Sequence, residues 1–282
     1  MFTMKNMWEN LNLSQKKELD EIVKKIVQEF SPVQIFCFGS RVSLSSRNSC
    51  FTSSEKQEEC NYDFLVITPS STRQENELQN FVSSKYKNGT ITIVNYSNDM
   101  LAGSLAIGQK FTTTIVEKGI ILYGPNQLNE SYRPLKRLER NPDKLKESLE
   151  LSFKNAWGFI DAAVERSLNE NYNLTVVLVY HALEQACRGA LEIFLGYRPS
   201  HQSLENLMNL CDNFKTDLSG GFQRDTRVGK KLFKALISGY SKAQLDVRFE
   251  VEKELALKLL KIGESYIEMV EGFCKIQLIK KN

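Results

Sequence analysis

The sequence lacks a long apolar run: no stretch of its 282 residues approaches the ~20 apolar residues that a membrane-spanning helix needs. Its start lacks an apolar core behind a basic end and a small-residue cleavage site, which argues against a secretory signal. Hydrophobic residues make up 41% and charged residues 25%, as in ordinary soluble domains. We therefore expect a soluble, cytoplasmic protein without a membrane partner.

Closely paired cysteines are also absent. Zinc sites and disulfide frameworks require cysteines at short or paired spacing, whereas the six cysteines here are dispersed without a CxxC pair. This pattern predicts reduced thiols, and the apolar runs around Cys37 and Cys187 place these two in the core.

Concentrated charge is missing as well. The formal net charge is only +3, whereas a protein that follows a phosphate backbone usually carries concentrated basic patches. Charge alone therefore neither predicts nor excludes a nucleic-acid partner.

The length of the chain permits two domains, each large enough to bury its own core. Near residue 124 the pattern changes, because the segment that follows contains three prolines and many charges with little periodicity. We predict a first domain over residues 1–124, a linker over 125–142 and a second domain over 143–282.

The first domain reads as an α/β (α+β) unit. Apolar residues at helical spacing after Ser14 predict an amphipathic helix over residues 15–30, which Pro32 ends. Short β-rich apolar runs predict four strands, the first two bridged by a long polar loop over 43–59. The strands are expected at residues 33–39, 62–68, 90–96 and 120–124.

The second domain reads as an all-α helical bundle. Residues 174–195, LTVVLVYHALEQACRGALEIFL, are apolar on most faces, which places this helix at the bundle centre. The helices are expected at residues 144–168, 173–195, 201–213, 227–247 and 251–278.

A Gly-Ser pair, Gly39 and Ser40, follows the first predicted strand. A turn there lets backbone amides approach a triphosphate closely, because glycine lacks a Cβ and serine adds a hydroxyl donor. Such sites normally add two carboxylates at i and i+2 on the next strand, where both point to one face and hold Mg²⁺. The alternative interpretation of the pair is an ordinary turn at a strand end.

Together with NYDFLVIT, residues 61–68, this pair resembles the minimal nucleotidyltransferases of the DNA polymerase β superfamily. Their signature is Gly-Ser, a spacer, then Asp-x-Asp followed by apolar residues. Asp63 aligns with the second Asp and Asn61 with the first, across a spacer longer than the family usually shows. The third carboxylate of the family falls on the next strand, which offers only Thr90 or Thr92.

The resemblance implies a nucleoside triphosphate ligand, with Gly39, Ser40, Arg41 and Asn61 as nucleotide-binding residues and Asp63 as the catalytic and metal-binding residue. One carboxylate makes a weak Mg²⁺ site, so we expect a degenerate metal centre. Arg41 either contacts a phosphate or is a solvated loop residue, and Asp63 alternatively caps a neighbouring loop.

The second half resembles the HEPN family, in which a His-Ala-x-Glu-type helix is followed by a Gly-rich break and a His-x-Leu-x-x-Leu-like helix start. A later aromatic, Arg-aromatic segment resembles HEPN domains that are fused to nucleotidyltransferase domains, a known bacterial architecture. The matching residues are His181, Ala182, Glu184, Gly196, His201, Leu204, Leu207, Tyr240, Arg248 and Phe249.

Many HEPN domains are metal-independent ribonucleases that use an Arg-x(4–6)-His motif, and that motif is absent here. His181 has no arginine at that upstream spacing, and Arg198 lies too close to His201. We expect His181 to be a satisfied residue on a buried helix and His201 to be a helix cap or first-turn residue.

The remaining charged residues of this half have structural interpretations. Glu184 and Arg188 stand four apart on one helix and are expected to pair. Arg248 is expected on a helix surface, with contact to a nucleotide phosphate as the alternative. An apolar bundle often buries a face against its own copy, so a homodimer is a further expectation.

Three functions stay open. The favoured one is a nucleotide-binding or regulatory protein whose transferase centre has lost metal chemistry. The second is an active Mg²⁺-dependent transferase that moves a nucleoside monophosphate to a small molecule or partner protein, with Glu58 or Glu59 completing the site. The third is a toxin–antitoxin or defence component acting on RNA.

Overall fold

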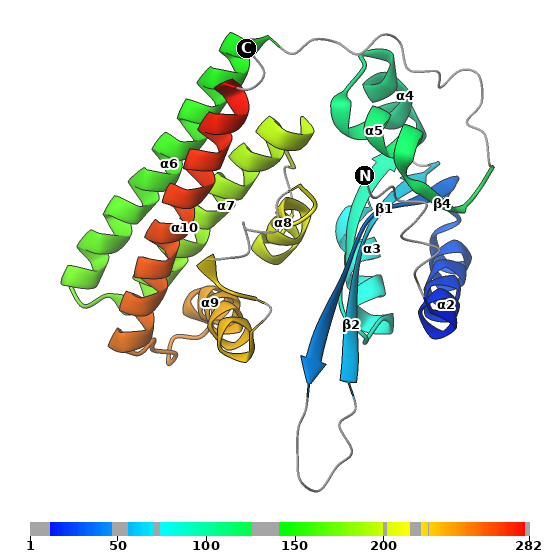
Figure 1. Ribbon diagram of the computed structural model, residues 1–282. Helices are drawn as coiled ribbons and strands as arrows, with labels where there is room; N and C mark the ends of the chain where they lie inside the picture. The colour runs from blue at the N-terminus through cyan, green and yellow to red at the C-terminus, as the bar shows by residue number, and fades with distance from the viewer. Residues whose placement is uncertain are drawn as a thin grey trace, which may run out of the picture. The chain divides into compact units, whose positions relative to one another are not determined.

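The computed structural model divides into two compact units, Met1–Leu138 and Glu139–Asn282, and each is considered by itself (Figure 1). Most of the predicted linker and His201 lie outside the described residues. The structure describes residues 12–46, 56–69, 74–125, 141–199, 202–214, 221–224 and 226–279.

A four-stranded mixed sheet forms the centre of the first unit (Figure 1). Its order is β3-β2-β1-β4, in which β2 pairs with β1 antiparallel and with β3 parallel, and β4 pairs antiparallel with β1. The predicted α/β class of this unit is confirmed. The strands are β1 (Gln34–Ser46), β2 (Lys56–Thr68), β3 (Ile91–Ser97) and β4 (Ile120–Tyr123).

The long polar loop predicted over residues 43–59 is wrong at both ends, and its middle, residues 47–55, lies outside the described residues. Instead β1 continues to Ser46 and β2 begins at Lys56, so the two strands form a long antiparallel ribbon. A β-bulge between Cys37 and Gly39 shifts the register within β1. Val42 and Leu44 alternate with serines in β1, and backbone pairing with β2 continues along these segments.

Helices cover both faces of the sheet. The first face packs against α2 (Leu13–Phe30) and α3 (Glu75–Lys85), which share one apolar cluster with alternate residues of β1, β2 and β3. The helix α2 begins at the N-cap Asn12, whose side chain accepts a hydrogen bond from the Gln15 backbone N–H, and not at Ser14 as predicted.

The second face packs against α4 (Asn98–Ala106) and α5 (Lys110–Lys118). Phe111 of α5 meets Phe38 of β1 edge to face, with ring centroids 5.5 Å apart. The intervening β2 residues Leu65 and Ile67 are also buried. Residues of β2 that point to this face are therefore enclosed and not open to solvent.

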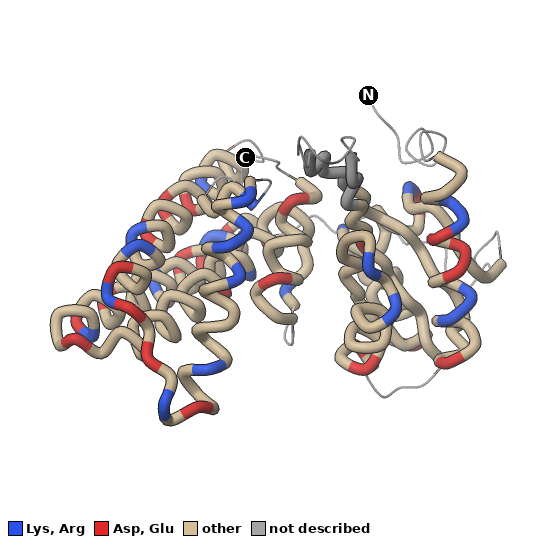
Figure 2. Tube along the Cα trace, turned by 90° about the horizontal axis from the view of Figure 1, so that it is seen from below, with Lys and Arg blue, Asp and Glu red and all other residues tan. Residues whose placement is uncertain are grey.

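The second unit is the predicted all-α bundle, with α7 at its centre. This helix packs against each of the other four, and twelve of its residues are buried. The helices are α6 (Pro142–Leu168), α7 (Tyr172–Leu195), α8 (Leu204–Cys211), α9 (Arg227–Leu245) and α10 (Lys253–Ile279). Basic and acidic residues occur together on helices of both units, which fits the small net charge (Figure 2).

The cysteines of the described residues form no disulfide. All are buried, as the sequence predicts for Cys37 and Cys187. In the helical unit the Cys187 thiol lies 3.4 Å from the Tyr266 hydroxyl, and the Cys211 thiol lies 3.8 Å from the Cys187 carbonyl oxygen. Burial raises the pKa of the Cys274 thiol from an ordinary 9.0 to about 12. Within the described residues no helix is long and apolar enough to span a membrane.

This shift predicts an alkaline loss of stability. The folded state holds the Cys274 proton more tightly than the unfolded state, so the contribution of Cys274 to stability is constant below pH 9.0 and is lost as pH rises toward about 12. Thermal unfolding followed by circular dichroism should show a falling midpoint across this window, and Cys274→Ala should flatten the fall. An equal fall in the variant would contradict this origin.

Candidate functional site

Asp63, the predicted metal ligand, lies inside the sheet on the central strand β2. Its backbone neighbours are Gly39 on β1 and Thr92 on β3. Its side chain alternates with those of Tyr62 and Phe64, which belong to the cluster with α2 and α3, so Asp63 faces the side of α4 and α5. The residue is 0% exposed. In this structure it is therefore closed to a nucleotide in solvent.

Asn61 is half-buried, and its amide oxygen is already used within the protein. The oxygen Oδ1 accepts hydrogen bonds from the backbone N–H of Thr90 at 2.9 Å and from the Thr90 hydroxyl at 2.8 Å. No described residue accepts a hydrogen bond from its amide nitrogen Nδ2. This side chain thus fixes the start of β3 and keeps two donor hydrogens.

The three positions that carry carboxylates in the resembled family come together in space. Asn61 and Asp63 lie two apart on β2. Of the two residues predicted for the third position, Thr92 lies beside Asp63 on β3 and Thr90 contacts Asn61. One carboxylate, one amide and one hydroxyl occupy them. No group of three or more His, Cys, Asp or Glu suited to a metal ion occurs within the described residues.

The predicted Gly-Ser turn is wrong in its local structure, because Gly39 and Ser40 lie inside strand β1. Gly39 is paired with Asp63, but Ser40 is paired with Tyr62, whose ring lies in the cluster with α2 and α3. Residues opposite each other on paired strands share a face. The sheet therefore separates the Ser40 side chain from Asp63.

Three other residues named from the sequence lie on the β1–β2 ribbon. Arg41 is a strand residue opposite Asn61 and not a loop residue, and its side chain lies outside the described ones. Glu58 and Glu59 are opposite Leu44 and Ser43, likewise with side chains outside the described set.

In the helical unit, His181 and Glu184 form a pair on α7. The His181 Nδ1 lies 3.0 Å from the Glu184 carboxylate, whose other oxygen meets Arg188 at 3.6 Å. The pairing of Glu184 with Arg188 is confirmed. The imidazole is half-exposed and borders the rings of Phe159 and Tyr240, so its pairing fits the expected satisfied histidine.

Arg248 does not lie on a helix surface as predicted. It is exposed in the connection between α9 and α10, where its backbone N–H donates to the Asp246 carboxylate at 3.0 Å. The Asp246 carboxylate acts there as a local turn acceptor.

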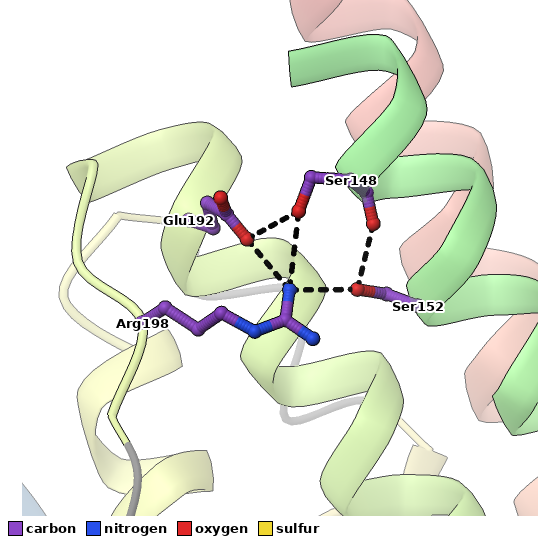
Figure 3. A network of polar contacts seen from close by, with 4 residues as sticks. All are labelled: Ser148, Ser152, Glu192 and Arg198. Carbon is purple, nitrogen blue, oxygen red and sulfur yellow. Dashed lines mark hydrogen bonds and ion pairs between the residues drawn. The ribbon is translucent and has the colours of Figure 1, made fainter. Parts of the chain in front are cut away.

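A polar network in the helical unit was not foreseen from the sequence (Figure 3). The Arg198 guanidinium donates to the Ser148 hydroxyl at 3.2 Å, to the Ser152 hydroxyl at 3.0 Å and to the Glu192 carboxylate at 2.6 Å. Ser148 also donates to Glu192 at 2.6 Å. The network connects the segment after α7 to α6. The sequence indicates the close approach of α6 and α7 only through Gly189, because an added Cβ there would lie 2.9 Å from Ser152.

Comparison with known families identifies the helical unit. Residues 149–273 match the family model of the HEPN domain. The helical unit is a HEPN domain. Its central helix α7 carries the His181–Glu184 pair and Arg188 inside the matched range, so the resemblance noted from these residues is confirmed.

A solved structure was also found for a nucleotidyltransferase-like protein from Exiguobacterium sibiricum 255-15. It is 14% identical, with coverage of 94% of this chain and 80% of that chain, and a TM-score of 0.31. A TM-score this low does not establish a shared fold. No curated protein matches the chain.

Proposed function

We propose that the first unit is a nucleotidyltransferase-like domain that binds a nucleotide without Mg²⁺ and does not transfer it, joined to a HEPN domain. One observation supports the proposed loss of metal-dependent chemistry. The three ligand positions of the resembled family hold Asn61, Asp63 and Thr92 side by side, with a single carboxylate that is 0% exposed.

These three residues form a poor binding site for Mg²⁺. The ion needs near-octahedral oxygen coordination, keeps several waters and is normally held by one or two carboxylates together with the substrate phosphates. Asp63 is enclosed and offers no surface to a hydrated ion. The Asn61 oxygen is engaged by two donors of Thr90. A metal would therefore have to displace internal contacts.

A nucleotide phosphate needs donors in place of the metal. The Asn61 amide nitrogen supplies hydrogens that no described residue uses. Arg41 is the strand neighbour of Asn61 on β1, which puts a cationic residue opposite Asn61. Hydrogen bonds from an amide and a guanidinium to phosphate are strong enough for metal-free binding.

Calorimetry of ATP, GTP, CTP and UTP with and without Mg²⁺ tests this proposal. Wild type is expected to bind at least one nucleotide equally well in both conditions. Asn61→Ala is expected to weaken binding about tenfold or more, because a hydrogen bond to a charged group contributes about 1.5–3 kcal/mol.

Asn61→Asp is the matched control for folding. Its carboxylate can still accept both hydrogen bonds from Thr90, so the start of β3 stays fixed, but it removes the donor and repels phosphate. We expect it to lose metal-free binding while the start of β3 stays folded. Mg²⁺-dependent binding or nucleotide transfer by wild type would instead favour an active transferase, and absence of any binding would leave the unit a scaffold.

A further inference from the structure

The helix α9 differs from the mixed surface of the other helices in its charge. Between Arg227 and Leu245 the sequence contains five basic residues and no acidic one. We define these as the basic strip: Arg227, Lys230, Lys231, Lys234 and Lys242. The nearest following acid, Asp246, lies beyond the end of the helix and accepts a hydrogen bond from the Arg248 backbone.

The basic strip lies on one side of α9. With 3.6 residues per turn, its five members fall within an arc of about 120° and extend along about 22 Å of the helix. The opposite side packs into the bundle through Phe233, Leu236 and Gly239, where an added Cβ on Gly239 would lie 3.1 Å from Val176 of α7. The apolar side is thus occupied, and the cationic side faces outward.

Most of the strip has no ionic partner. Arg227, Lys231, Lys234 and Lys242 are exposed, and none forms an ion pair with a described residue. The Lys242 ammonium lies over the Phe249 ring at 5.4 Å, which leaves its charge uncompensated. A rigid row of uncompensated cations complements a polyanion of matching length.

We infer that the basic strip of α9 binds the phosphate backbone of duplex DNA, independently of the nucleotide site proposed for the first unit. Single strands need a series of exposed aromatic rings on which bases stack. Beside the strip, Phe233 is buried, Tyr240 is stacked on Tyr180 at 3.6 Å, and the half-buried Phe249 lies under Lys242. The wide major groove of B-form DNA admits a helix, whereas the A-form groove of duplex RNA is too narrow.

The contact is expected to be independent of base sequence. The small side chains between the cations, Ser238 and Ser241, suit contacts to phosphate, and no Asn, Gln or acidic residue lies within the arc of the strip to read base edges. Binding should therefore depend steeply on salt, with a slope set by the number of cations involved.

Fluorescence anisotropy of the full-length protein with a labelled mixed-sequence DNA duplex tests this inference. The variant Lys231→Gln/Lys234→Gln/Lys242→Gln is expected to weaken binding about tenfold or more and to reduce the salt slope by about 1 per lysine. The control Lys253→Gln/Lys258→Gln/Lys261→Gln removes the same charge from exposed positions of α10 and should leave both values unchanged.

Four outcomes would overturn the inference. These are no binding of the duplex by wild type at low salt, equal losses in the two triple variants, tighter binding of single-stranded DNA or duplex RNA, and tighter binding of anionic lipid vesicles. All six lysines are exposed, so neither variant should disturb the fold. Nucleotide calorimetry on the same proteins should be unaffected, which separates this inference from the proposed nucleotide site.

Discussion

Gly89→Ala is expected to destabilise the first unit by about 3 kcal/mol or more, because two penalties act at one position. Gly89 has a φ of +146°, a conformation that side chains with a Cβ rarely adopt. An added Cβ would also lie 2.1 Å from the carbonyl oxygen of Cys60, which is backbone and cannot rotate away. Hydrogen-exchange mass spectrometry of the β2 and β3 peptides measures the loss of stability in the first unit separately from the second.

Gly103→Ala provides the matched control in the same unit. Gly103 lies on α4, is exposed and has nothing within 4 Å of an added Cβ. Alanine there should stabilise the helix by up to about 1 kcal/mol. Hydrogen exchange like that of wild type in both variants would contradict the close contact between Gly89 and the backbone of β2.

Asp63→Ala is expected to unfold or strongly destabilise the first unit, by about 3 kcal/mol or more, instead of merely removing an activity. Asp63 is fully buried on the central strand and takes part in interactions within the protein. Truncation would leave its partners unpaired and a space between β2 and the helices of the second face. Hydrogen exchange of the same peptides reports the change.

Asp63→Asn separates charge from shape at this position. The amide keeps the volume and part of the hydrogen bonding, so it should cost less stability than alanine. Metal-free nucleotide binding should persist in Asp63→Asn, because the proposed donors belong to Asn61 and Arg41. A variant that folds like wild type but loses nucleotide binding would show that Asp63 contacts the ligand.

Most helices and strands could be predicted from local hydrophobic patterns in the sequence. Helical periodicity predicted α6 and α7 nearly to their observed bounds, and apolar β-rich runs predicted the cores of all four strands. The extension of β1 to Ser46 was missed because the serine-rich composition was interpreted as a loop, although Val42 and Leu44 alternate with Ser43 and Ser45 as in a strand. Pairing along that ribbon depends on backbone bonds to the facing strand, which residue type does not reveal.

The candidate site was predictable as a set of positions but not as an arrangement. Spacing on β2 correctly put Asn61 and Asp63 on one face, and order along the chain left Thr90 or Thr92 for the third position, of which Thr92 is paired with Asp63. The separation of Ser40 from Asp63 depends on the register after the bulge between Cys37 and Gly39. The contact of Arg198 with Ser148 and Ser152 joins residues about fifty apart, which no local pattern encodes.

Manganese binding tests the central claim, that the first unit holds no catalytic metal, most directly. Mn²⁺ replaces Mg²⁺ in oxygen-ligand sites and its free and bound forms differ in electron paramagnetic resonance. With a bound nucleotide identified by calorimetry, we expect wild type and Asp63→Asn to give the same Mn²⁺ spectrum. Stoichiometric Mn²⁺ bound to wild type and lost in Asp63→Asn would contradict the account.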